Sequence, residues 1–176
     1  MNIGDKISNF NLVNTNNEII SNYTFADRHA LCIIFMSHDC KQSNSYWGRL
    51  IKLAHSYEED NIAMVAINPN DATQNPKDSL EFMKLFMADK LAPHFYYLKD
   101  EDQSVAKSFG AEKTPDVFLF NSKRELVYHG IIDDNWENES QVMMAYLEDA
   151  IEYCLDGIDI DYPELPVDGT DIIWKK

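Results

Sequence analysis

The pattern of hydrophobic and polar residues in the first half of the chain predicts a hairpin, a strand, a helix and a second strand. Two runs, ALCIIFMS and IAMVAIN, are apolar throughout, which is typical of strands buried on both faces of a sheet. Between them, from Cys40 to Tyr57, apolar residues recur at helical spacing. Nearer the N-terminus, the turn-prone NTNN separates two shorter apolar runs and predicts a β-hairpin.

The second half of the chain continues the alternation. FYYL predicts a strand, QSVAKSFG a short helix that ends at Gly110, and DVFLF with ELVYHG an antiparallel hairpin. Start signals predict two more helices: Asp78 and Glu81 form a capping box before one apolar face, and Ser140 opens the last helix. Strands that alternate with helices predict an α/β fold, in which helices cover both faces of a central sheet.

The periodicity stops after Asp156. The last segment, DGIDIDYPELPVDGTDIIWKK, gains Pro and Gly and predicts an extended tail packed on the domain. A chain of 176 residues is long enough for one hydrophobic core. We therefore expect one domain, residues 1–156, followed by a tail, residues 157–176, whose role is open and includes covering the mouth of a site.

The charge balance narrows the range of partners. The chain has 30 acidic and 15 basic side chains, a formal net charge of −15, and no cluster of Lys or Arg. Nucleic acid and acidic membrane surfaces would be repelled. No apolar run approaches the roughly 20 residues of a membrane span, and the first residues lack the pattern of a secretory signal. The sequence therefore predicts a cytoplasmic protein that binds neither nucleic acid nor a membrane.

The three cysteines are Cys32, Cys40 and Cys154, an odd number without a close pair, so we expect reduced thiols. Cys32 lies within an apolar strand and Cys154 on an apolar helix face, which is typical of inert core thiols. Cys40 follows a buried strand and stands in polar surroundings at the start of a predicted helix. The unpaired N–H groups and the dipole of a helix start favour a thiolate. Cys40 is thus either a nucleophile or a small structural residue.

Several neighbours of Cys40 would influence its pKa. Ser37, His38 and Lys41 can donate hydrogen bonds or positive charge, whereas the adjacent Asp39 opposes ionisation. The five histidines are scattered, and no glycine-rich phosphate loop is present. We therefore expect no metal and no cofactor.

Thr114 and Pro115 form a second feature of note. A proline directly before the strand DVFLF marks the start of that strand, and on its own it is simply a turn proline.

In combination, four stretches carry a family resemblance. FMSHDCKQSNSYWGRL, VAINPNDATQNPKDSLEFMK, YLKDEDQSVAKSFGAEKTPDVFLFN and LVYHGIIDDNW resemble the alkyl hydroperoxide reductase and thiol-specific antioxidant (AhpC/TSA) family of thioredoxin-like redoxins. The resemblance implies a thioredoxin-like fold: a central mixed β-sheet flanked by helices, with an N-terminal β-hairpin and an extended C-terminal tail. It also implies that Cys40 is the redox-active cysteine, that Thr114 and a cis Pro115 hold the substrate backbone, and that the Ser37 hydroxyl lies beside the sulfur.

The chain departs from the family pattern in its other cysteines. It has no C-x-x-C motif, and Lys113 and Thr170 stand where close relatives often have further cysteines. Lys113 is a candidate to stabilise the thiolate of Cys40. The resemblance therefore implies an enzyme with a single reactive cysteine, a thiol oxidoreductase or peroxiredoxin-like antioxidant that acts on a disulfide or hydroperoxide. An external thiol such as glutathione or a thioredoxin would complete its cycle. The alternative is a redox-inactive binding module with the same fold.

Overall fold

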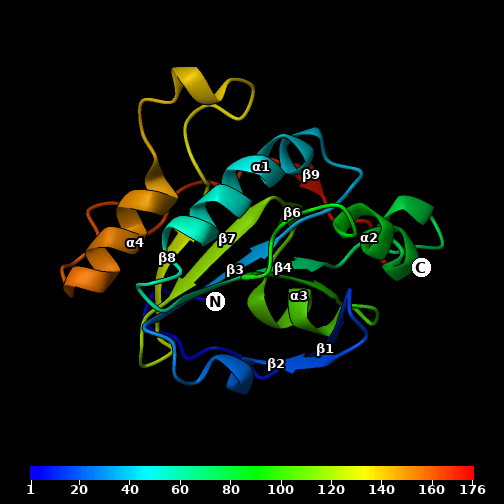
Figure 1. The fold of residues 1–176 in the computed structure, drawn as a ribbon, viewed down its shortest axis with the longest axis horizontal. Coiled ribbons are helices and arrows are strands. Elements are labelled where there is room, and N and C mark those ends of the chain that lie inside the picture. The colour runs from blue at the N-terminus through cyan, green and yellow to red at the C-terminus, as the bar shows by residue number, and fades with distance from the viewer.

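The computed structural model describes residues 1–176 and contains a mixed seven-stranded sheet in the order β2-β1-β5-β4-β3-β7-β8 (Figure 1). The strands of this sheet are β1 (Asn11–Asn14), β2 (Ile19–Ser21), β3 (Ala30–Phe35), β4 (Ile62–Asn68), β5 (Phe95–Lys99), β7 (Asp116–Phe120) and β8 (Leu126–Gly130). β3, β4 and β5 run parallel, and the other pairs in the sheet are antiparallel. The predicted N-terminal hairpin and central sheet are confirmed.

Helices cover both faces of the sheet. The helices are α1 (Lys41–Ser56), α2 (Leu80–Met87), α3 (Ser104–Phe109) and α4 (Tyr146–Asp156), with short 3-10 turns η1 (Asn22–Phe25), η2 (Pro76–Asp78) and η3 (Glu139–Gln141). α1, α2 and α4 lie on one face and α3 lies on the other (Figure 1). None of the helices combines the length and the apolar character needed to cross a membrane.

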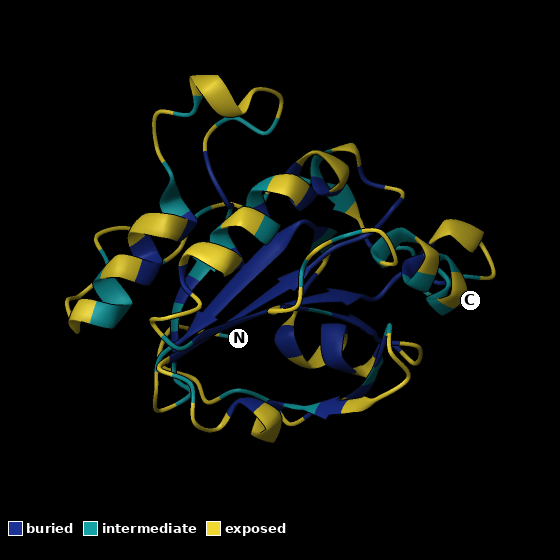
Figure 2. Ribbon diagram, viewed as in Figure 1, coloured by how far each residue is buried: buried dark blue, intermediate teal, exposed yellow.

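The central strand β3 separates two hydrophobic cores. Cys32 and Ile34 point into the core under α1, whereas Leu31 and Ile33 point into the core that contains α3. This division follows from the alternation of side chains along a strand. Every residue of β3 and β4 is buried, as the dark ribbon in Figure 2 shows. β3 is therefore a rigid support for the connection that leads to Cys40.

Two helix starts differ from the prediction. The N-cap of α2 is Ser79, whose hydroxyl accepts the N–H of Phe82 at 3.2 Å, while Asp78 ends η2 and is buried. The predicted capping box is wrong because the Asp78 carboxylate is occupied by donors from other segments. α4 begins at Tyr146 and not at Ser140, because Ser140 belongs to the separate turn η3.

The segment after α4 runs along β8 and then reaches β6 (Lys113–Thr114). The backbone N–H of His129 donates to the carbonyl of Pro163 at 2.9 Å, and Leu165 N–H donates to the carbonyl of His129 at 3.0 Å. Further on, β9 (Thr170–Asp171) pairs antiparallel with β6, a two-residue strand outside the main sheet. This pairing brings the C-terminal residues to the chain segment that directly precedes Pro115.

Candidate active site around Cys40

Cys40 is the N-cap of α1, at the end of the connection that leaves β3. Its Sγ accepts a hydrogen bond from the backbone N–H of Ser43 at 3.4 Å. A helix start offers unpaired N–H groups and the positive end of the helix dipole, and both stabilise an anionic sulfur. The side chain has no exposed surface. The helix start is therefore where the sequence predicts it, but the sulfur is covered.

The sulfur faces the residues that precede β7. The Thr114–Pro115 peptide bond is cis, and Cys40 Sγ donates a hydrogen bond to the carbonyl oxygen of Thr114 at 2.8 Å. The neutral thiol is thus held by an acceptor, whereas the N–H of Ser43 favours the thiolate. The two protonation states of Cys40 therefore have different stabilising partners within one small site.

The hydroxyl of Ser37 forms its hydrogen bond with Thr114. Its Oγ lies 2.7 Å from Oγ1 of Thr114, its backbone N–H donates to Oγ of Ser43 at 3.4 Å, and both Ser37 and Thr114 are buried. Through these contacts Ser37 fixes the residue in front of Pro115 against the start of α1. The expectation that its hydroxyl lies beside the sulfur therefore has no hydrogen bond to support it.

Lys113 directly precedes Thr114, the residue whose carbonyl contacts the Cys40 sulfur. It is half-buried in β6 and its side chain forms no hydrogen bond or ion pair. Adjacent residues of a strand point to opposite faces, so Lys113 leaves β6 on the side opposite to Thr114. The structure therefore contains no contact through which Lys113 stabilises a thiolate.

Residues 168–172 of the tail, here called the strap, cover Cys40. Thr170 is paired with Thr114 and lies close enough to the sulfur that its hydroxyl and N–H lower the pKa of Cys40. At Gly169 an added Cβ would lie 2.2 Å from the carbonyl oxygen of Thr114, so only glycine allows this approach. Asp168 accepts a hydrogen bond from the side-chain amide of Gln42 at 3.3 Å. Sequence patterns missed these contacts because the tail has no periodicity to indicate its register.

The three cysteines differ in acidity. Burial raises the pKa of the Cys40 thiol, but hydrogen bonds from Ser43 and Thr170 outweigh this effect, and the pKa lies below its ordinary value. Burial raises the pKa of Cys32 and of Cys154. Because the thiolate is the nucleophile, Cys40 is the thiol best prepared for reaction.

Replacement of Thr170 by valine is expected to raise the pKa of Cys40. Valine keeps the shape of threonine but cannot donate to the thiolate, so the ionised form loses a stabilising partner and the titration moves to higher pH. Ultraviolet absorbance of the thiolate against pH, with the Cys40→Ser spectrum subtracted, measures the shift. A midpoint that stays at the wild-type pH would exclude a contact between the hydroxyl and the sulfur.

A buried carboxylate fixes the connection in front of Cys40. Asp78 Oδ1 accepts the backbone N–H of His38 at 2.7 Å and the side-chain amide of Asn68 at 2.8 Å. Its Oδ2 accepts the amides of Asn70 at 3.1 Å and Asn75 at 2.7 Å. The one sequence signal for this cluster is the density of asparagine in INPNDATQNPKD.

The His38 ring faces an aromatic cluster. Nε2 lies 3.1 Å from the hydroxyl of Tyr97, and the ring stacks on Trp47 and meets Phe86 edge-on. Burial lowers the pKa of His38, although Asp78 opposes that shift. The ring is therefore neutral near pH 7. It does not supply the positive charge that its position two residues before Cys40 suggested.

Two depressions lie near the site. The smaller one, about 120 Å³, borders Pro115 and is lined in part by Gln42, Tyr46, Trp136 and Asp168. It therefore adjoins both Pro115 and the strap, although Cys40 itself does not line it.

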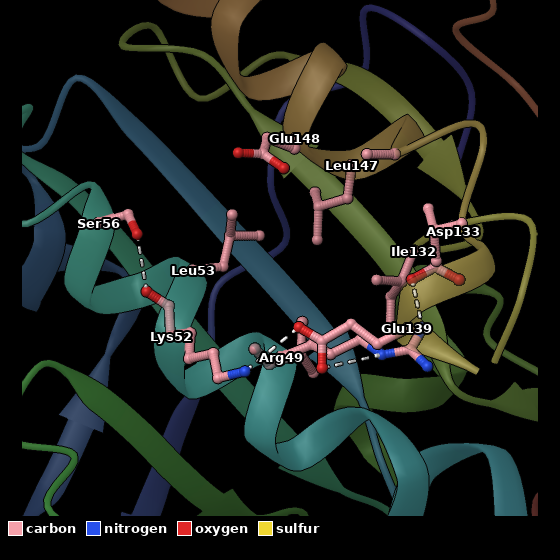
Figure 3. Close-up of a pocket in the computed structure, with 12 residues that line it drawn as sticks. Arg49, Lys52, Leu53, Ser56, Ile132, Asp133, Glu139, Leu147 and Glu148 are labelled. Atoms are coloured by element: carbon pink, nitrogen blue, oxygen red, sulfur yellow. Dashed lines mark hydrogen bonds and ion pairs between the residues drawn. The ribbon is translucent and has the colours of Figure 1, made fainter. Parts of the chain in front are cut away.

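The other depression, about 300 Å³, lies between α1, α4 and the segment after β8 (Figure 3). Four of its charged side chains form two ion pairs: Arg49 Nη1 contacts Asp133 at 2.6 Å, and Lys52 Nζ lies 3.3 Å from Glu139. Cys40 does not line it. No group of three His, Cys, Asp or Glu side chains in the structure could hold a metal ion.

Sequence comparison adds to this geometry. Residues 3–129 match the AhpC/TSA family, and this stretch includes Cys40, Thr114 and Pro115. The chain belongs to the AhpC/TSA family. None of the curated proteins matches this AhpC/TSA chain.

The chain is also similar to solved structures. A hypothetical protein of Sinorhizobium meliloti is 35% identical with a TM-score of 0.92, covering 99% of this chain and 96% of the relative. An uncharacterized conserved protein of Geobacillus kaustophilus is 31% identical with a TM-score of 0.91, covering 99% and 93%. A peroxidoxin of Mycobacterium tuberculosis, 13% identical over 89% of this chain and 95% of its own, has a TM-score of 0.62. The fold of this AhpC/TSA protein is thioredoxin-like, which confirms the expected fold class.

Proposed function

We propose that this AhpC/TSA protein is a thiol-dependent oxidoreductase with one reactive cysteine, Cys40. The observation that carries the proposal is the position of the Cys40 sulfur, which lies between the start of α1 and the carbonyl of Thr114 next to a cis proline. A sulfur with helix donors on one side and a backbone acceptor on the other is prepared to ionise and to meet a substrate.

The reaction is thiol-disulfide exchange. The Cys40 thiol releases its proton to solvent, and the thiolate attacks one sulfur of a disulfide. The new bond is a mixed disulfide, and the other sulfur leaves as a thiolate. Cys32 is buried in the core under α1 and Cys154 lies at the margin of the same core, so we do not propose either free thiol as the resolving group. An external thiol, glutathione or a thioredoxin, attacks the mixed disulfide and restores Cys40.

Three residues assist Cys40 in this proposal. Thr114 and Pro115 bind the substrate backbone beside the sulfur, while Ser37 is a positioning residue that acts through Thr114. Residues 1–156 form the redoxin domain and residues 157–176 the tail packed on it. Three unpaired thiols suit a reducing compartment such as the cytoplasm.

Hydroperoxide reduction is a second candidate reaction, which the family match and the peroxidoxin fold favour. The thiolate would attack the terminal peroxide oxygen, forming a sulfenic acid while the alcohol leaves. Polarisation of the O–O bond needs a donor, and the guanidinium group of Arg49 is already bound by Asp133 and the carbonyl of Asn135. Exchange with disulfides is therefore the preferred reaction.

Intact-mass analysis after limiting oxidised glutathione tests the proposal. We expect one glutathione adduct on the wild type and none on Cys40→Ser, with Cys154→Ser behaving as wild type. Because the pKa of Cys40 is lowered, adduct formation should persist below the pH at which an ordinary thiol, with a pKa near 8.5, ceases to react. Adducts spread over Cys154, or no adduct at any pH, would favour the redox-inactive binding module.

A further inference from the structure

The strap occupies the free edge of β6 as an added strand. Thr114 is paired with Thr170 and Lys113 with Asp171, and the N–H of Ile172 donates to the carbonyl of Glu112 at 2.8 Å. Addition of an extended segment to an open strand edge is a recurring way in which proteins bind peptides. The strap therefore uses the type of contact that a bound polypeptide would use.

The strap also presents one side chain to the reactive sulfur. Thr170 is paired with Thr114, whose carbonyl oxygen lies 2.8 Å from Cys40 Sγ, and its hydroxyl is near enough to lower the pKa of that thiol. A cysteine sulfur would stand at nearly the same point as this hydroxyl, because both atoms are attached to Cβ. A sulfur in that position is adjacent to Cys40 without any rearrangement of the strap backbone.

The residues around Thr170 define what fits. Gly169 has no room for a Cβ against the carbonyl of Thr114, Asp168 accepts from Gln42, and Ile172 is 4% exposed within the core that contains α3. From residue 168 to residue 172, the strap thus consists of a hydrogen-bond acceptor, a glycine, a threonine, an exposed residue and a buried aliphatic residue.

We propose that the strap is a built-in stand-in for the substrate, and that Cys40 acts on extended polypeptide segments in which a glycine precedes the reacting cysteine and an aliphatic residue lies two positions after it. This inference rests on the proposed function. The incoming segment displaces the strap, pairs with β6 and places its disulfide sulfur where the Thr170 hydroxyl lies. The Cys40 thiolate then forms a mixed disulfide with that sulfur, and the second sulfur of the substrate leaves as a thiolate.

Displacement of the strap can be local. On its C-terminal side, Ile173 N–H donates to Asn70 Oδ1 at 2.9 Å and the carbonyl of Ile173 accepts from Asp71 N–H at 2.9 Å. On its N-terminal side, Leu165 is bound to β8. The segment between these two anchors can therefore leave β6 while the tail stays attached to the domain.

The first part of the test opens the strap in the full chain. Gly169→Ala adds a Cβ against the Thr114 backbone, so we expect Cys40 to react with the neutral hydroxyethyl disulfide about tenfold faster than in the wild type. Gly48→Ala is the matched control, because its added Cβ meets no atom within 4 Å, and it should keep the wild-type rate. If Gly169→Ala does not fold, Asp168→Ala frees Gln42 without a clash and should give a smaller increase.

The second part measures the substrate preference. Two peptides, Val-Asp-Gly-Cys-Asp-Ile-Ile and its variant with alanine in place of glycine, each carry thionitrobenzoate as a mixed disulfide on the cysteine. Release of the coloured thionitrobenzoate follows attack on the peptide sulfur, and intact mass identifies the peptide adduct on Cys40. With the opened variant we expect the glycine peptide to react about tenfold faster than the alanine peptide.

The outcomes separate this inference from the proposed function. If hydroxyethyl disulfide modifies Cys40 but both peptides react at the same rate, the inference that the strap imitates the substrate is wrong, while the proposed oxidoreductase function is supported. If the wild type reacts as fast as Gly169→Ala, the strap does not occlude the sulfur and the inference also fails. If no disulfide modifies Cys40 in any variant, the proposed function fails, and the inference with it.

Discussion

Replacement of Asp78 by alanine is expected to lower the free energy of unfolding by about 3–5 kcal/mol. The carboxylate is fully buried and accepts four hydrogen bonds, from the backbone of His38 and from the side chains of Asn68, Asn70 and Asn75. Alanine leaves these donors without an acceptor, and unsatisfied buried donors are costly. Chemical denaturation, followed by circular dichroism and extrapolated to water, measures the loss.

The variant Asp78→Asn separates charge from hydrogen bonding. An asparagine oxygen can replace Oδ1, but its NH₂ group would face the amides of Asn70 and Asn75. Neither amide can turn around, because Asn70 Oδ1 already accepts from Ile173 N–H and Asn75 Oδ1 from Lys77 N–H. We therefore expect Asp78→Asn to have a free energy of unfolding between that of the wild type and that of Asp78→Ala. The exposed Asp89→Ala should change stability by no more than about 0.5 kcal/mol. If Asp78→Ala lowered the free energy of unfolding by as little as Asp89→Ala, the hydrogen bonds of Asp78 would not stabilise the fold as we infer.

A buried lysine completes the electrostatics of this region. Lys99 Nζ donates to the carbonyl of Asn70 at 2.5 Å. Burial lowers its pKa, and the neighbouring Glu101 and Asp78 oppose that shift. The same Asn70 holds the tail through Ile173, so the cluster joins the connection before Cys40 to the anchor of the strap.

The parts of this structure that the sequence predicts are those that depend on local patterns. The apolar runs of β3 and β4, the helical spacing of α1 and the αL Gly110 after α3 are each encoded within a few residues, and each is found. Cys40 at the start of α1 is a consequence of two such neighbours, a strand and a helix.

The contacts that the sequence does not predict join distant segments. Asp78 carries a local helix-start signal, yet His38, 40 residues away, takes its carboxylate, and the long-range contact prevails over the local one. The two-residue strand β9 is too short to show a period, so no pattern indicates that Thr170 lies against Thr114. Burial of the Cys40 sulfur follows from that pairing, so the sequence does not predict it either.

The variant Thr170→Cys is expected to form a disulfide with Cys40 under mild oxidation and to resist denaturation. Thr170 is paired with Thr114 next to Cys40, and its hydroxyl is near enough to lower the pKa of that thiol, so the new thiol stands close to its partner. The bond would close the long loop between residues 40 and 170, which in the chain-entropy account stabilises by about 4–5 kcal/mol. Denaturation with and without a reductant, together with thiol alkylation counted by intact mass, measures both effects.

The neighbouring variant Asp171→Cys is the matched control for this crosslink. Asp171 is exposed and, one position further along β9, points away from the sulfur, so its thiol should stay free under the same oxidation. Protection of Cys40 from alkylation in Thr170→Cys but not in Asp171→Cys would fix the register of the strap to a single residue. Equal crosslinking of the two variants would mean that the strap can pair with β6 in more than one register. The expected preference for glycine before the reacting cysteine depends on a single register, so it would not hold.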